Sequence, residues 1–205
     1  MGNENSLRED ISYLRQMAES GRKGQILGGI FLAGAGVVFG CACVISYAGY
    51  QGFLPMSRQD HLYLWLGAFA LFMAFWVVMF LRMRTSPTKS VSASNTTFGT
   101  IWGGCGIGVM VSFAAVEVVT SQLHAPVIQA GFVPTIFAFY GTAWFASGAL
   151  AKRPWMHIAA AGSFVFAFIM ALLTDMPVQI LVMGAGLLLL LTLPGLKLIA
   201  DEARK

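Results

Sequence analysis

The sequence predicts an all-α, polytopic integral membrane protein with six transmembrane helices and a short N-terminal amphipathic helix on the cytoplasmic side. Of the 205 residues, 57% are hydrophobic and only 11% are charged, against roughly 25% charged residues in soluble domains. Long neutral runs separate the charged residues. Each run can hold the roughly 20 apolar residues with which a helix crosses a bilayer. In lipid, such segments satisfy their backbone hydrogen bonds as helices, which excludes strands.

The chain divides into three parts. Residues 1–24 form a cytoplasmic segment, residues 25–198 form the transmembrane domain, and residues 199–205 form a cytoplasmic tail. The predicted spans are residues 25–47, 62–82, 98–120, 127–150, 155–174 and 178–198. Their ends are defined to within a few residues.

The N-terminal segment has the pattern of one amphipathic helix. Ser6 and Glu9 have the spacing of a capping box, in which each side chain bonds the backbone of the other. Leu7, Ile11 and Leu14 follow at helical spacing and form a narrow apolar stripe. This stripe can lie on the inner leaflet, dock on the bundle or bind a partner helix. Acidic and basic residues nearly balance along the segment, which favours packing on protein over anionic lipid.

Lysine and arginine residues predict the orientation. Twelve of the 13 lie in the N-terminal segment, in the second and fourth connections or near the C-terminus, and Arg58 alone lies on the opposite side. Positive residues stay on the cytoplasmic side, so both termini are expected inside the cell, in the inner (plasma) membrane. The net charge of +4 then reflects topology and not nucleic-acid binding.

Small residues predict where helices approach closely. Gly36 and Gly40 are four residues apart in the first span, and Gly104 and Gly108 are four apart in the third. Such faces bring helix backbones together in lipid, where dispersion contacts drive association. The main expectation is that the first and third spans pack on each other within one chain. The alternative is that one face forms an oligomer or docks on another membrane protein.

Two prolines fall inside predicted spans. Pro134 lies about one-third into the fourth span, and Pro194 lies in the inner part of the sixth. Each lacks a backbone N–H, which favours a kink. Cys41, Cys43 and Cys105 also lie within spans, where we expect them to pack as small apolar residues.

Five acids and histidines collect at the outer ends of the spans. They are Asp60, His61, Glu117, His124 and Asp175. Carboxylates and imidazoles from different connections can form a proton-linked or metal-binding patch. No HxxxH or HExxH spacing occurs, however, so single interfacial residues are favoured over a site. If the third helix continues through Leu123, Glu117 and His124 lie two turns apart on one side of it.

The ionisable residues argue against catalysis and ion coupling. The central part of each predicted span lacks charged residues, whereas proton pumps and ion-coupled transporters normally place acids there. No nucleophile elbow, P-loop or helix-borne histidine pair occurs. We therefore predict no catalytic, cofactor-binding or metal-binding residues. The favoured function is a non-catalytic accessory subunit that binds another membrane protein or forms a homo-oligomer. The alternative is a small oligomeric transporter or channel for a neutral or apolar solute.

Overall fold

The computed structural model describes residues 28–84 and 93–204. The predicted N-terminal helix with Leu7, Ile11 and Leu14 lies outside these residues. The described residues are helical and contain no strand, which confirms the all-α class. In chain order the elements are α2 (Gly29–Tyr50), α3 (Arg58–Arg84), α4 (Ala93–Leu123), the 3-10 helix η1 (Pro126–Gly131), α5 (Phe132–Ala151), α6 (Pro154–Leu172), α7 (Val178–Leu187), the π-helix η2 (Leu188–Thr192) and α8 (Leu193–Ala203).

Five of the described helices are long and apolar enough to cross a membrane. They are α2, α3, α4, α6 and the continuous helix from α7 into α8. The remaining long helix, α5, is packed among its neighbours, with Phe137, Trp144 and Ser147 buried. The membrane-protein class predicted from composition is thus supported by the helices themselves.

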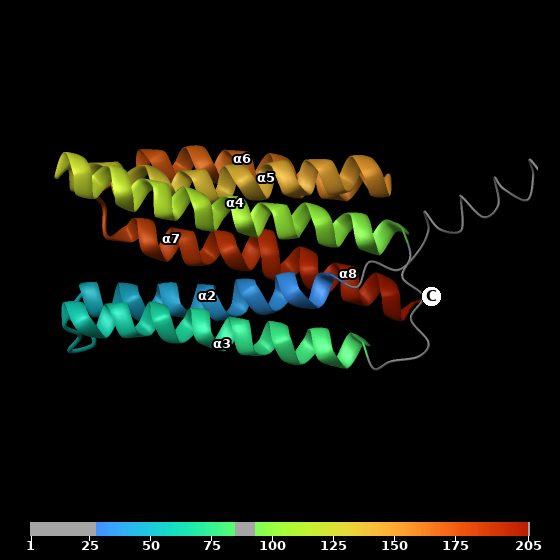
Figure 1. Cartoon of the computed structure of the whole chain (residues 1–205), viewed down its shortest axis with the longest axis horizontal. Helices are drawn as coiled ribbons and strands as arrows, with labels where there is room; N and C mark the ends of the chain where they lie inside the picture. Colours follow the sequence, from blue (N-terminus) through green and yellow to red (C-terminus); the bar gives the residue numbers. More distant parts are fainter. Residues whose placement is uncertain (1–27, 85–92, 205) are drawn as a thin grey trace, which may run out of the picture.

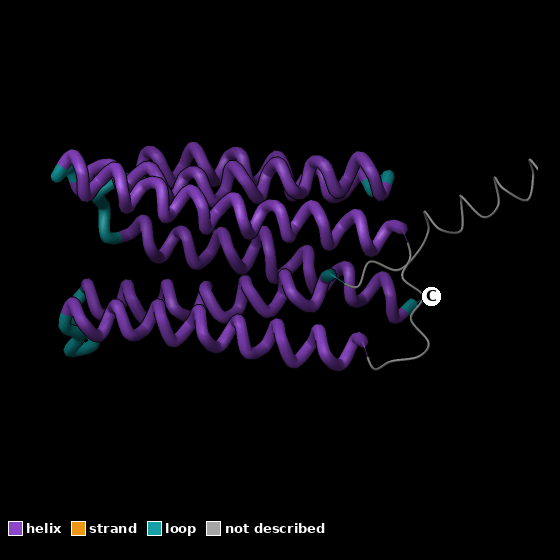
Figure 2. The backbone as a smooth tube through the Cα atoms, viewed as in Figure 1, coloured by secondary structure: helices purple, strands orange, loops and turns teal. Residues whose placement is uncertain are grey.

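The helices lie side by side along one axis (Figure 1). The most extensive contact is between α5 and α6, while α2 packs against α3 and against α7, η2 and α8. The outermost helices have fewer neighbours: α3 packs mainly on α2, and α4 mainly on α5. Short loops occur only at the two ends of the described bundle (Figure 2). We call these the His61 end, where α2 meets α3, and the Arg153 end, where α5 meets α6.

The fourth predicted span begins differently from the prediction. Its first residues form η1, and the α-helix begins only at Phe132. Pro134 therefore lies in the first turn of α5 and not one-third along a span. A first-turn N–H has no partner within its helix, so proline costs nothing there. The kink predicted at Pro134 is wrong for this reason.

The sixth predicted span does depart from a regular α-helix, just before Pro194. The π-helical turn of η2 precedes this proline. Pro194 has no N–H to donate to the carbonyl of Leu190, four residues earlier. The indole Nε1 of Trp144 on α5 donates to that carbonyl at 2.9 Å, and this hydrogen bond is buried. The side chain of the neighbouring helix α5 thereby supplies a hydrogen-bond donor to the Leu190 carbonyl in the irregular turn.

The packing predicted between the first and third spans is wrong. A Cβ on Gly36 would lie 2.8 Å from both the Leu187 carbonyl oxygen and the Thr192 nitrogen, and one on Gly40 would lie 3.2 Å from the side chain of Leu188. Gly36 and Gly40 thus face the sixth predicted span. A backbone surface made of glycines is complementary to any close helix, and the sequence does not encode which one.

Two contacts fasten the Arg153 end. Arg153, in the turn between α5 and α6, forms an ion pair with Asp201 of α8, with Nη1 and Oδ2 3.3 Å apart. The ammonium group of Lys197 lies 4.7 Å from the ring centroid of Trp155, a cation–π contact. Together they tie the α5–α6 hairpin to the last helix.

Candidate functional site

The five acids and histidines of the predicted patch belong to connections and helix ends at the His61 end. They do not form one constellation. Within residues 28–84 and 93–204, no group of three His, Cys, Asp or Glu residues is close enough to hold a metal ion. The three cysteines are free thiols. The patch instead separates into individual contacts that each have a structural partner or end a helix.

Asp60 caps the start of α3. Its carboxylate oxygen Oδ2 accepts hydrogen bonds from the backbone nitrogen and the hydroxyl of Ser57, both at 2.7 Å. The Ser57 hydroxyl lies 3.3 Å from the backbone nitrogen of Asp60 and accepts from it. These reciprocal bonds form the capping arrangement that satisfies N–H groups at a helix start. The Asp60 carboxylate therefore has a structural role as part of the N-terminal cap of α3.

His61, the next residue, faces α2. Its Nδ1 lies 3.0 Å from the hydroxyl oxygen of Ser46, which is fully buried. The ring stacks on Tyr50, with ring centroids 4.2 Å apart and an interplanar angle of 19°. One residue along a helix is a rotation of about 100°, so adjacent side chains point in different directions. The His61 side chain thus packs α3 against α2, while the Asp60 side chain caps the start of α3.

Glu117 and His124 also separate. The α4 helix does continue through Leu123, as considered from the sequence. The carboxylate of Glu117, however, accepts two hydrogen bonds from the amide of Gln129 in η1, at 3.0 and 3.2 Å. His124 follows the helix in a left-handed conformation with φ 51°, and Asp175 has φ 64° between α6 and α7. His124 and Asp175 therefore lie in the turns that follow α4 and α6.

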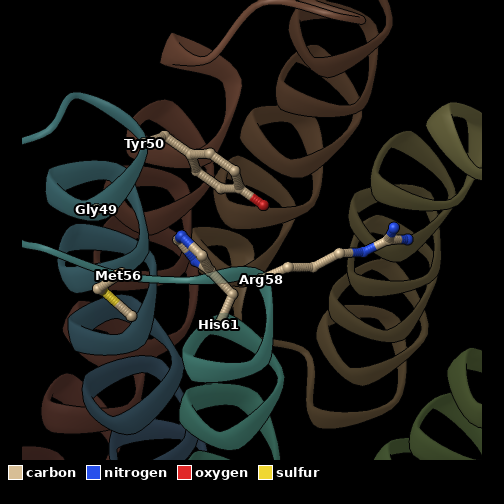
Figure 3. A pocket seen from close by; sticks show the side chains of 5 residues that line it. All are labelled: Gly49, Tyr50, Met56, Arg58 and His61. Carbon is tan, nitrogen blue, oxygen red and sulfur yellow. The ribbon is translucent and has the colours of Figure 1, made fainter.

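A cavity that sequence reasoning missed lies beside His61. Its volume is about 450 Å³, and it is lined by Gly49, Tyr50, Met56, Arg58 and His61. Figure 3 shows Tyr50 and His61 next to each other, while the Arg58 side chain extends from the start of α3 away from these two rings, toward neighbouring helices. The sequence signal that points here is Arg58 itself, the single basic residue on its side of the predicted topology.

The glycines of α4 fall into two groups, one in contact with α5 and one without a neighbouring helix among the described residues. Gly108 packs on α5, since a Cβ there would lie 2.9 Å from the ring of Phe139. Four other glycines of this helix would meet no atom of the described residues within 4 Å if given a Cβ: Gly99, Gly103, Gly104 and Gly106. We call these four the open α4 face. Gly99, Gly103 and Gly106 follow one another at helical spacing and share one side of the helix.

Comparison of the chain with protein-family models, with curated proteins and with solved structures finds no match. The function proposed next therefore draws on geometry, packing and charge alone.

Proposed function

We propose that this protein is a non-catalytic accessory subunit of the inner membrane, which crosses the membrane six times with both termini in the cytoplasm. In this proposal it packs against another membrane protein through the open α4 face. The observation that carries the proposal is a contrast between two sets of glycines: those of α2 contact neighbouring helices, whereas the four of the open α4 face contact none within the described residues.

Counting α5 as a membrane span, which brings the total to six, is supported by its length and by its neighbours. It has 20 residues, which at 1.5 Å per residue is about 30 Å, the thickness of a hydrocarbon core. It packs along most of α6, a helix apolar enough to cross a membrane. An even number of spans also agrees with 12 of the 13 basic residues lying on one side.

The open α4 face is costly unless another helix covers it. Each glycine inside a helix is about 1 kcal/mol less favourable than alanine. In α2 this cost is offset by backbone contact with the sixth predicted span, because close approach increases dispersion contacts and shortens weak C–H···O bonds. On α4 the described chain supplies no such contact at Gly103. A helix from another protein, lying across Gly99 and Gly103, would supply it.

Two carboxylates at the His61 end support a non-catalytic role. Asp60 is bonded to Ser57, and Glu117 is bonded to Gln129. A catalytic acid or base needs a free lone pair or proton facing a substrate. The Asp60 carboxylate instead caps the start of α3, and the Glu117 carboxylate connects α4 to η1.

Copurification tests the proposal. The full chain with an affinity tag is isolated in mild detergent without crosslinker, as wild type, as Gly103→Leu and as Gly67→Leu. Gly67 of α3 is the matched control, because a Cβ added there would also meet no atom within 4 Å. We expect a partner at fixed stoichiometry with the wild type and with Gly67→Leu, and loss of that partner with Gly103→Leu.

Two outcomes contradict the proposal. The first is isolation of a pure homo-oligomer that conducts a neutral solute in liposomes, which would favour a transporter or channel. The second is a partner retained by Gly103→Leu but lost when Leu7, Ile11 and Leu14 are all changed to serine. That result would assign partner binding to the N-terminal stripe and not to α4.

A further inference from the structure

The rings of His61 and Tyr50 form one wall of the half-open cavity at the His61 end. The His61 ring is held from one side by the buried hydroxyl of Ser46 and covered on its face by the stacked ring of Tyr50. Gly49 makes room for it, because a Cβ at this position would lie 3.1 Å from His61 Nε2 and 2.7 Å from the sulfur of Met56. Two elements therefore fix the imidazole and the phenol beside one space of about 450 Å³.

Arg58 supplies an unpaired positive charge to this cavity. It lines the cavity and makes no hydrogen bond or ion pair within the described part of the chain. Its nearest acid in sequence, Asp60, lies about 200° away around the helix and is bonded to Ser57. His61, three residues on, shares the Arg58 side of α3. The cation and the imidazole thus belong to one face, and the carboxylate to the other.

We propose that this cavity binds the phosphate group of a phospholipid headgroup. A guanidinium donates two parallel hydrogen bonds to phosphate oxygens, and it is the side chain best suited to this geometry. The Tyr50 hydroxyl and an imidazole N–H of His61 can each donate one more. Arg58, Tyr50 and His61 line one cavity, and with the long Arg58 side chain turned toward the two rings they form a donor set that fits a tetrahedral anion.

The position of the cavity favours a lipid over free phosphate. It lies where apolar helices α2 and α3 end, which is the depth of lipid headgroups when those helices cross a bilayer. The connecting loop exposes large apolar side chains, Phe53 at 79% and Leu54 at 41%. Exposed apolar residues at a helix end are suited to the boundary between headgroups and acyl chains. One amphiphile can satisfy both the charge and this apolar rim.

Thermal unfolding with added ligand tests the proposal. The full chain in non-ionic detergent is titrated with a short-chain phosphatidylglycerol, with inorganic phosphate, and with a diacylglycerol of the same acyl chains. We expect a saturable rise in melting temperature with phosphatidylglycerol alone. Binding to Arg58→Gln should be about tenfold weaker, because the bidentate ion pair is lost. Equal stabilisation by inorganic phosphate would overturn the lipid source, and equal stabilisation by diacylglycerol would overturn phosphate recognition.

A matched control separates the cavity from general charge effects. Lys152→Gln removes an exposed basic residue at the Arg153 end and should bind phosphatidylglycerol as the wild type does. Equal weakening by Lys152→Gln and Arg58→Gln, or no weakening by Arg58→Gln, contradicts the proposal. Should Arg58→Gln itself melt at a lower temperature without lipid, Arg58→Lys provides the comparison. This variant keeps the positive charge but loses the paired guanidinium donors, so it should also bind phosphatidylglycerol more weakly than the wild type.

Discussion

Gly29 of α2 and Gly195 of α8 are in reciprocal backbone contact. A Cβ on Gly29 would lie 2.6 Å from the carbonyl oxygen of Gly195, and a Cβ on Gly195 would lie 2.6 Å from the carbonyl oxygen of Gly29. Backbone atoms cannot rotate away as a side-chain tip can. The first and last described helices can therefore approach this closely only with glycine at both positions.

Replacing Gly195 with leucine should strongly destabilise the bundle. The added side chain has to push α8 away from α2, and overpacking of this kind costs about 1–3 kcal/mol or more. Thermal unfolding in detergent, followed by far-UV circular dichroism, measures the effect. Gly67→Leu, on the open side of α3, is the control and should melt close to the wild type. Equal melting temperatures for the two variants would show that the α2–α8 contact is looser than these backbone distances indicate.

The bond between Trp144 and Leu190 makes a second prediction. Trp144→Phe removes the indole donor and leaves the Leu190 carbonyl buried without this partner. An unpaired buried polar group costs about 1–3 kcal/mol, and we expect a loss of this size in unfolding experiments. Pro194→Ala restores a backbone N–H, so the same Trp144→Phe change should cost less in that background. An undiminished cost there would mean that lost packing, and not the hydrogen bond, sets the effect.

The pattern of helices was predictable from the sequence because it depends on local composition. The runs between charged residues locate every long helix of the described residues, and the errors are at helix ends, as at η1 before Phe132. Which helices pack against each other was not predictable from the sequence. Gly36 and Gly104 have the same small-residue pattern, yet the first is filled by η2 and the second is open. Only the three-dimensional arrangement distinguishes them.

The candidate site shows the same division. The sequence groups Asp60 and His61 in one polar patch, and in the structure both lie in the first turn of α3. A single residue step turns one toward the Ser57 cap and the other toward Ser46. Ser46 itself had no sequence signal, because a serine in an apolar run is ordinarily a small packing residue. Its role depends on α3 folding back beside α2.

Glu117→Gln should leave the fold and partner binding intact. The carboxylate at this position accepts hydrogen bonds only from Gln129 among the described residues, and a glutamine carbonyl can accept one of them. The loss for such an exposed contact should be below about 1 kcal/mol. Melting temperature and the copurified partner are measured together with the wild type. Normal melting with loss of the partner would assign Glu117 a binding role.

The orientation proposed for the chain can be read from reporter fusions. Alkaline phosphatase becomes active only where its disulfides form, outside the cytoplasm. Because 12 of the 13 basic residues fall on one predicted side, fusions after Gly52 and His124 should be active, and a fusion after Lys205 should be inactive. A fusion after Lys152 isolates α5: it is inactive if α5 crosses the membrane. Activity after both His124 and Lys152 would show that α5 does not cross, and the six-span topology would fail.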